Sequence, residues 1–315
     1  MNVADWLAVM GREYLDKYIP AGGAAIKFLV ADGNDDALID EIAEASRQRG
    51  YVTATVDARE MDINKVEEIF WAVARQVRWQ DLAASVRRRG FQDLQWQIPD
   101  GTAETFESIA DAIGTNRQLL ENAMNRWLTV NVFRDYRLSS DFRLAMMFLC
   151  LEPLKSPMAG PTPLESSIID WLNGELRLIS ALRSAQIYQK IARHNARDLF
   201  VSLGHWVKSA GKPGVSVVID ARAIGVPTRA QAPDPSQWYS RAQILDLYEV
   251  LRQFIDSMDE TENTFIAVVF PPMLTSDPKR GMEAYRALQM RIVEEVRDRT
   301  QENPFAALIS LSEER

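Results

Sequence analysis

The fold is decided by the stretch Ala24-Ala25-Ile26-Lys27-Phe28-Leu29-Val30-Ala31-Asp32-Gly33-Asn34-Asp35-Asp36-Ala37-Leu38. Its first part, up to Asp32, is apolar apart from Lys27, which is typical of a strand covered on both faces of a sheet. Residues 32–36 then provide turn and helix-capping chemistry. Apolar residues recur at helical spacing after the turn, at Leu38, Ile39, Ile42 and Ala45. The stretch therefore predicts a buried strand, a loop and a helix.

The same order of strand, loop and helix holds nucleotide phosphates in proteins that carry the pattern G-x-x-x-x-G-K-[ST]. In that pattern, backbone N–H groups and the lysine bind the phosphates. Four positions of this chain depart from it: Ala31 replaces the first glycine, Asp36 the second glycine, Ala37 the lysine, and Leu38 the hydroxyl residue. The sequence keeps the layout of such a loop and lacks its chemistry.

Charge makes this loop hostile to a nucleoside triphosphate. Asp35 and Asp36 lie where the phosphates would rest. At roughly 5 Å and an effective dielectric constant of about 20, two like unit charges repel by about 3 kcal/mol. A helix N-terminus stabilises an anion by only about 0.3 to 2 kcal/mol, which is less than this repulsion. We therefore expect the whole loop, including Gly33 and Asn34, to be a vestigial nucleotide site that binds ATP negligibly.

Composition indicates a globular protein, with 315 residues, 47% hydrophobic and 25% charged. The net charge of −8 argues against nonspecific adherence of the whole surface to nucleic acid or to an anionic membrane. A single cysteine, Cys150, excludes an internal disulfide. The sequence shows neither a signal peptide nor a membrane-spanning run. We expect a cytoplasmic protein without a membrane partner.

Further strands follow the same logic of buried apolar runs. We predict them at residues 51–57, 215–220 and 264–270, with a short last strand within 305–311. A helix from about Asp36 to Gln48 separates the first two strands, so this part of the sheet is expected to be parallel. Between residues 63 and 211 only helical patterns occur.

These elements predict an α/β fold, in which a parallel sheet is interrupted by a large all-helical insertion. The expected domains are a discontinuous α/β domain of residues 1–60 and 212–315 and a helical insertion of residues 61–211. His194 and His205 stand without a cluster of cysteines or carboxylates, so no metal site is predicted.

Three stretches of the chain carry a resemblance to a known family. They are Glu13-Tyr14-Leu15-Asp16-Lys17-Tyr18-Ile19-Pro20-Ala21-Gly22-Gly23 leading into Ile26-Lys27-Phe28, then Trp171-Leu172-Asn173-Gly174-Glu175, and residues 242–259. From about residue 10 to 300, the chain resembles the BREX-system ATP-binding-domain family, small P-loop ATPases of bacterial anti-phage defence islands. The resemblance implies a P-loop NTPase (AAA-like) fold, with the nucleotide in the loop after the first strand. It also implies a strand-end Asp-Glu pair that acts on the metal and the attacking water.

The strand-end pair of this chain reads Asp220-Ala221. Asp220 could still reach a metal ion, but Ala221 can neither orient nor deprotonate water. With the altered loop, this is a second, independent loss. We therefore predict no catalytic residue and no cofactor, and treat Asp220 and Ala221 as vestigial; ATP and Mg²⁺ would bind only under the alternative that unorthodox residues support an ATPase.

A basic and aromatic segment offers a different function. It contains Arg75, Arg78, Arg87, Arg88 and Arg89, near Trp79, Phe91 and Trp96. Such residues are typical of a face that binds nucleic acid or a partner protein. The alternative is structural: the three consecutive arginines would complement the C-terminus of a helix that ends just before Gly90.

The leading hypothesis is a noncatalytic, P-loop-derived scaffold or regulatory subunit of an anti-phage defence complex, acting through protein contacts. Its expected partners are an ATPase, a helicase or a nuclease, in a homo-oligomer or hetero-oligomer. Two alternatives stay open: an ATP-binding defence ATPase with unorthodox active-site residues, and a module that binds nucleic acid through the arginines.

Overall fold

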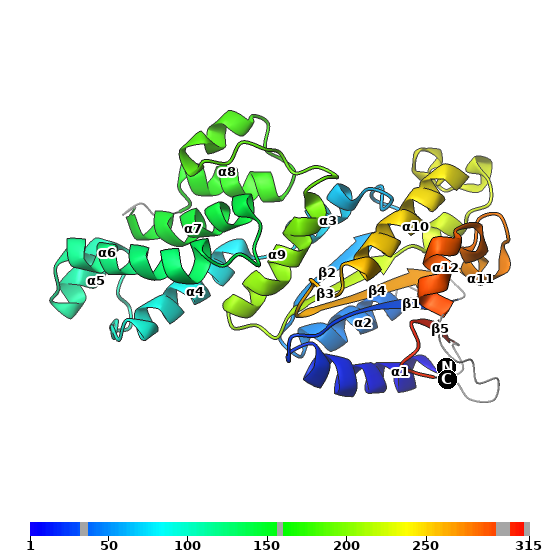
Figure 1. The fold of residues 1–315 in the computed structure, drawn as a ribbon, viewed down its shortest axis with the longest axis horizontal. Helices are drawn as coiled ribbons and strands as arrows, with labels where there is room; N and C mark the ends of the chain where they lie inside the picture. The colour runs from blue at the N-terminus through cyan, green and yellow to red at the C-terminus, as the bar shows by residue number, and fades with distance from the viewer. Residues whose placement is uncertain (32–36, 156–159, 294–302, 312–315) are drawn as a thin grey trace. The chain divides into compact units, whose positions relative to one another are not determined.

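The computed structural model describes residues 1–31, 37–155, 160–293 and 303–311. The chain divides into two compact units. The first, called the sheet unit here, consists of Met1–Val77 and Lys212–Arg315, and the second, the helical unit, is Arg78–Gly211 (Figure 1). No helix among the described residues has the length and apolarity needed to cross a bilayer.

The sheet unit is built on five parallel strands in the order β2-β3-β4-β1-β5 (Figure 1). The strands are β1 (Ala24–Ala31), β2 (Val52–Asp57), β3 (Val215–Asp220), β4 (Thr264–Phe270) and β5 (Leu308–Leu311). Strands β3 and β4 are buried along their whole length, as their continuous apolar sequences require. The predicted parallel α/β sheet is confirmed.

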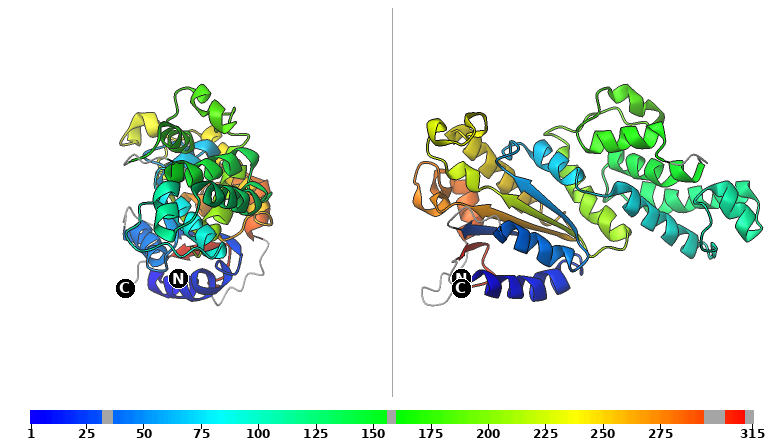
Figure 2. Two further views of the ribbon diagram at one scale, coloured as in Figure 1. Left: turned by 90° about the vertical axis from the view of Figure 1, so that its left-hand side faces the viewer. Right: turned by 180° about the vertical axis from the view of Figure 1, so that it is seen from behind.

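Helices cover both faces of this sheet (Figures 1 and 2). One face carries α1 (Val3–Val9), the π-helix η1 (Met10–Tyr18) and α2 (Ala37–Arg47). The other face carries α10 (Arg241–Asp256) and α12 (Arg286–Val293). Also in this unit are α3 (Val66–Ala74), α11 (Met273–Ser276) and the short helices η4 (Arg222–Gly225), η5 (Arg229–Gln231), η6 (Pro235–Gln237) and η7 (Met282–Ala284).

Successive side chains of each strand point to opposite faces of the sheet, so they pack in two separate cores. Leu29 and Phe265 pack with Trp6 of α1 in the core on the α2 face. Phe270 points to the other face, where its ring lies 6.5 Å from the ring of Tyr248 on α10. Because successive strand residues point to opposite faces, a strand in this position must be apolar throughout.

Lys27 is the polar exception in β1, and it is 4% exposed. Its Nζ donates hydrogen bonds to the carbonyl oxygens of Phe305 at 2.5 Å and Ala306 at 3.0 Å. The same ammonium group lies 4.7 Å from the centre of the Tyr14 ring. These contacts compensate the buried charge and tie the segment before β5 to β1.

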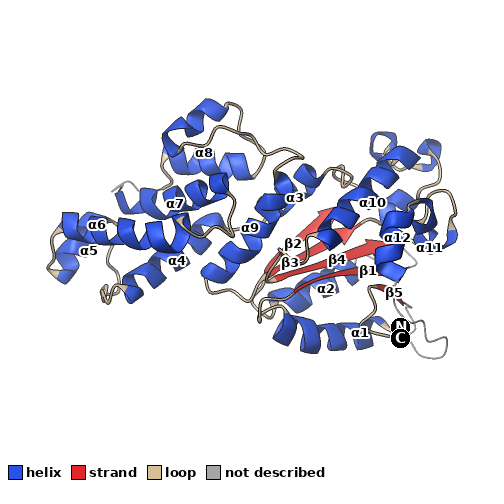
Figure 3. Cartoon of the chain, viewed as in Figure 1, coloured by secondary structure: helices blue, strands red, loops and turns tan. Residues whose placement is uncertain are grey.

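The helical unit has no strand among its described residues, in agreement with the sequence (Figure 3). Its elements are α4 (Trp79–Asp93), α5 (Phe106–Ile113), α6 (Arg117–Leu128), η2 (Thr129–Phe133), α7 (Ser140–Lys155), α8 (Pro163–Leu172), η3 (Ile179–Ala185) and α9 (Ala196–Ser209).

Gly90 does not end a helix, so the structural alternative for the arginine triplet was wrong on this point. Helix α4 continues through Gly90 to Asp93. A Cβ atom at position 90 would lie 3.0 Å from Trp127 and 3.1 Å from Met124, both on α6. Gly90 therefore serves the close approach of two helices.

We predict that Gly214→Ala destabilises the sheet unit. Gly214 precedes β3, and an added Cβ would lie 2.3 Å from the backbone oxygen of Asn263, which cannot move without disturbing β4. Overpacking of this kind costs about 1–3 kcal/mol, measurable as a lower urea midpoint. Lys212→Ala, an exposed change in the same loop, should alter the free energy of unfolding by less than about 0.5 kcal/mol. Equal midpoints for the two variants would contradict the prediction.

Candidate functional site

The candidate site lies at the carboxyl ends of β1 and β4. These strands are neighbours, yet β1 leads into α2 on one face of the sheet and β4 leads towards α12 on the other. Ligands of open α/β sheets bind outside the carboxyl ends of strands at such a reversal. The loop that follows β1 contains Gly33, Asn34, Asp35 and Asp36, and it lies outside the described residues. The assignment of that loop as a vestigial nucleotide site therefore stays a prediction.

The positions that flank this loop are described. Ala31 is the last residue of β1 and is 8% exposed. Ala37 begins α2 and is exposed, so a lysine there would have room. Leu38 is 9% exposed and belongs to the apolar core between α2 and the sheet. The residue in the register of the hydroxyl group thus contributes to packing.

Asp220, at the end of β3, is buried and held by an arginine two residues later. Its Oδ1 accepts hydrogen bonds from Nε of Arg222 at 2.9 Å and from the backbone N–H of Arg222 at 3.0 Å. Its Oδ2 accepts from Nη2 of Arg222 at 2.7 Å. The intervening Ala221 is fully buried and donates its N–H to Val269 on β4. Both carboxylate oxygens of Asp220 are therefore already engaged.

Strand β2 ends in the same way, in register with β3. Asp57 lies opposite Asp220 in the parallel ladder. It accepts the backbone N–H of Arg59 at 2.7 Å, and Nη2 of Arg59 lies 2.7 Å from its Oδ2. The same Nη2 lies 3.9 Å from Oδ2 of Asp220. Reading the sequence strand by strand missed both arginines; the signal that could have revealed them is the repeated tripeptide Asp-Ala-Arg at residues 57–59 and 220–222.

These two clamps, the Asp57–Arg59 and Asp220–Arg222 pairs, determine what the edge can do chemically. A divalent cation needs carboxylate oxygens that are free to coordinate it. A bidentate arginine–carboxylate pair is among the stronger charge-assisted contacts, and breaking a buried one leaves an uncompensated charge. A metal ion at Asp220 would therefore compete with the guanidinium of Arg222 for the carboxylate.

Loops of the chain itself cover the ends of β2 and β3. The hydroxyl group of Tyr239 donates to the backbone oxygen of Met61 at 2.5 Å and accepts the N–H of Ile63 at 3.1 Å. Burial raises the pKa of Tyr239 to about 12, so the hydroxyl group keeps its donor proton even at a pH where an exposed tyrosine ionises.

Arg280 fastens the loop after β3 from the other side. Its guanidinium donates to four backbone oxygens at 2.9 to 3.2 Å, those of Ile224, Val226, Pro227 and Tyr239. A planar fork of donors suits this task, whereas a single ammonium group could not span the four acceptors.

The five arginines predicted to form a binding face differ in their exposure and in their ion pairs. Arg75 lies in the sheet unit and is exposed. Of those in the helical unit, Arg87 is buried and paired with Glu104 at 2.5 Å. Arg78 pairs with Asp81 at 3.1 Å, Arg89 lies 3.9 Å from Asp93, and Arg88 is exposed. Burial thus removes Arg87 from the exposed surface.

The fold defines an α/β protein with a central five-stranded parallel sheet and an added helical unit. A family model described as BREX system ATP-binding protein BrxC/D matches residues 18–314. The chain therefore belongs to this family, and membership implies a role in a phage-defence system. No curated protein and no solved structure matches the chain.

The two clamps give a matched test of burial. Arg222→Ala would leave Asp220 buried with only Arg59, at 3.9 Å, as a neighbouring cation, at an expected cost of about 3–5 kcal/mol in the free energy of unfolding. Arg59→Ala removes the same type of pair where the arginine is 53% exposed, and should cost less than about 1 kcal/mol. Urea denaturation measures both. Similar losses in the two variants would show that burial does not set the strength of the clamp.

Proposed function

We propose that this chain is a noncatalytic, P-loop-derived scaffold or regulatory subunit of the phage-defence system, which acts through protein contacts. The observation that carries this proposal is the clamp on Asp220. The one carboxylate at the end of β3 is committed to Arg222, and the buried Ala221 follows it where a catalytic carboxylate would be needed.

Two further features support an AAA-like P-loop ancestry without its chemistry. Strand β1 lies inside the sheet between β4 and β5 and leads to α2, so the intervening loop would face a ligand at the reversal point. The sequence of that loop has carboxylates at Asp35 and Asp36 and no lysine. Retained architecture with altered loop chemistry favours a role in which surfaces matter more than turnover.

The alternative is an ATP-binding protein that uses unorthodox residues, and it draws on the printed description of the family as ATP-binding. Under this alternative, Mg²⁺ would compete with Arg222 for Asp220. A cation that displaced the arginine would free the guanidinium to contact a phosphate. The two readings differ in whether the isolated chain binds ATP.

We expect calorimetric titration with ATP and Mg²⁺ to millimolar concentration to give no saturable binding, because the acidic loop repels the phosphates. No ATP turnover is expected either. Saturable binding that Ala37→Glu abolishes would contradict the expected lack of ATP binding, since the added charge lies at the start of α2, and ATP turnover with it would overturn the noncatalytic proposal. Asp40→Asn, an exposed change on the same helix, controls for effects of charge elsewhere.

We also expect partners of the defence system to copurify with the tagged chain from its native host. An ATPase, helicase or nuclease encoded beside it would fit a scaffold or regulatory subunit, in a hetero-oligomer or with further copies of the chain. A solitary monomer with robust ATP turnover would contradict the proposal. Size-exclusion chromatography with light scattering distinguishes these outcomes.

A further inference from the structure

Charge is divided unevenly between the two units of the chain. The sheet unit has 20 lysine and arginine residues against 30 aspartate and glutamate residues, a net charge of −10. The helical unit has 16 against 14, a net charge of +2. The net negative charge of the whole chain therefore belongs to the sheet unit, and the helical unit does not repel an anionic partner.

The clearest excess of cations in the helical unit lies in the segment that joins α8 to α9 and includes the first residues of α9 (Figure 1). Residues 176–197, called the basic segment here, contain no aspartate or glutamate. Their five cations are Arg177, Arg183, Lys190, Arg193 and Arg197. A run of this kind is typical of a surface that binds a polyanion.

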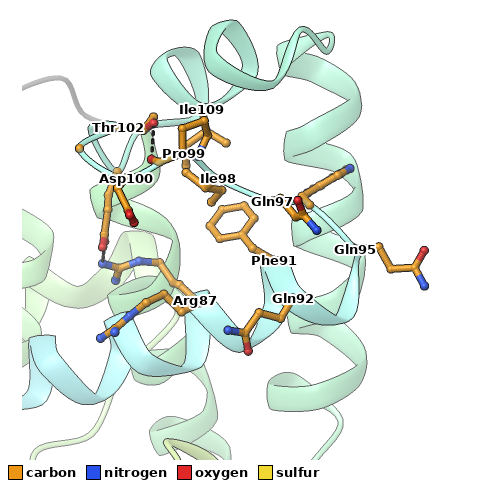
Figure 4. Close-up of a pocket in the computed structure, with 14 residues that line it drawn as sticks. Arg87, Phe91, Gln92, Gln95, Gln97, Ile98, Pro99, Asp100, Thr102 and Ile109 are labelled. Carbon is orange, nitrogen blue, oxygen red and sulfur yellow. Dashed lines mark hydrogen bonds and ion pairs between the residues drawn. The ribbon is translucent and has the colours of Figure 1, made fainter.

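The cavity beneath the connection between α4 and α5 lacks such an excess (Figure 4). Its lining contains the cations Arg87 and Arg88 together with the anions Asp100 and Glu104. A polyanion binds where cations outnumber anions, so the basic segment suits it better than this cavity.

Buried apolar side chains determine which residues of the basic segment face solvent. The buried members of the segment are Leu182, Ala185, Ile187, Ile191 and Ala196. All the cations except the half-buried Arg197 are exposed. None of these four exposed cations forms an ion pair among the described residues. Their charges are therefore available to a partner.

Hydrogen bonds hold the basic segment in a compact conformation. Nζ of Lys190 donates to the backbone oxygen of Arg177 at 3.0 Å. The indole N–H of Trp171 on α8 donates to the backbone oxygen of Gln189 at 2.9 Å, and Nε2 of His194 lies 3.4 Å from Oε1 of Gln189. These contacts bring the beginning, middle and end of the segment together, so the cations share one surface.

Other side chains of the basic segment favour nucleic acid as the polyanion. Tyr188 is 66% exposed, and an exposed aromatic ring among cations can stack on a base. Exposed hydroxyl groups of Ser180 and Ser184 and exposed amides of Gln186 and Gln189 add the donors that usually contact phosphates beside arginine and lysine.

The backbone of the basic segment favours a single strand over a duplex. A duplex is usually read by an α-helix or a two-stranded ribbon that enters the major groove. The exposed cations of the segment lie on the 3₁₀-helix η3 and on irregular backbone. Stacking on Tyr188 also requires an unpaired base.

We propose that the basic segment binds single-stranded nucleic acid, with its cations on the phosphates and Tyr188 stacked on a base. This function goes beyond the noncatalytic role proposed above and does not depend on it. A chain that binds ATP and a chain that does not would both present this surface.

Fluorescence anisotropy of the full chain with fluorescein-labelled oligothymidylate and oligouridylate of twelve nucleotides tests the proposal. We expect binding that weakens as salt rises, because each phosphate contact adds about 0.7 to the slope of log affinity against log salt. The double variant Arg177→Ala/Arg193→Ala should lower this slope by about 1.4. The matched control is Arg241→Ala/Arg286→Ala, which removes two exposed arginines from the sheet unit and should leave the slope unchanged.

The contribution of the ring is measured at constant salt. Tyr188→Ala should weaken binding about fivefold or more, whereas Tyr188→Phe keeps the ring and should keep the affinity. Thermal melting verifies that all variants are folded. Preference for oligothymidylate would assign the surface to DNA, and preference for oligouridylate would assign it to RNA.

Four results would overturn the proposal. They are no binding at about 50 mM salt, equal losses in the two double variants, unchanged affinity in Tyr188→Ala, and a duplex of the same length that binds as tightly as the single strand. Displacement of the oligonucleotide by a dodecapeptide of glutamate as effectively as by unlabelled oligonucleotide would also overturn it, and would assign the surface to an acidic protein. The ATP titration is independent of all these results, so the noncatalytic proposal stands or fails separately.

Discussion

The parallel pairing of β1 with β4 is the constraint on which the sheet unit depends. It places Ala24 opposite Thr264 and Val30 opposite Phe270, so the two ends of a long chain meet at the centre of one sheet. Parallel strands in this position are buried on both faces and need helices on each side. Helices α1 and α2 supply one layer and α10 and α12 the other. The reversal point between β1 and β4 follows from the same pairing.

Much of the sheet could be predicted from local sequence because buried parallel strands leave an unmistakable pattern. The bounds predicted for β3 and β4 match those observed, since each strand is a continuous apolar run with a clear stop, such as Pro271 after β4. Gly90 shows the limit of local reading. A glycine after three arginines is typical of a helix end, but here the packing of α6 requires the small residue within the helix.

The candidate site was less accessible to sequence reasoning, for a physical reason. Substituted positions such as Ala221 are visible in the sequence, because a missing functional group needs no geometry to be noticed. The clamp of Arg222 on Asp220 is a matter of side-chain orientation at a strand end. The burial of Arg87 was harder still to predict. Its partner Glu104 lies 17 residues later in the chain and reaches it only when the chain folds back over α4.

Membership in a phage-defence family and the pairing of Asp220 with Arg222 are compatible if the chain acts through protein contacts. In that arrangement the sheet unit contributes a frame, in which Tyr239 and Arg280 hold the segments that follow β2 and β3. Recognition and catalysis use different chemistry, so a role in protein contacts does not require catalytic residues.

The paired tripeptides at the ends of β2 and β3 also bear on how the sheet assembles. Asp57 and Asp220 come to lie directly opposite each other, and two bare carboxylates in that position would repel. Each arginine is only two residues from its aspartate, so the neutral pair needs no long-range contact and is available while the strands are still apart. Each carboxylate is thus neutralised by its own arginine when β2 and β3 pair, and electrostatic repulsion opposes their pairing little.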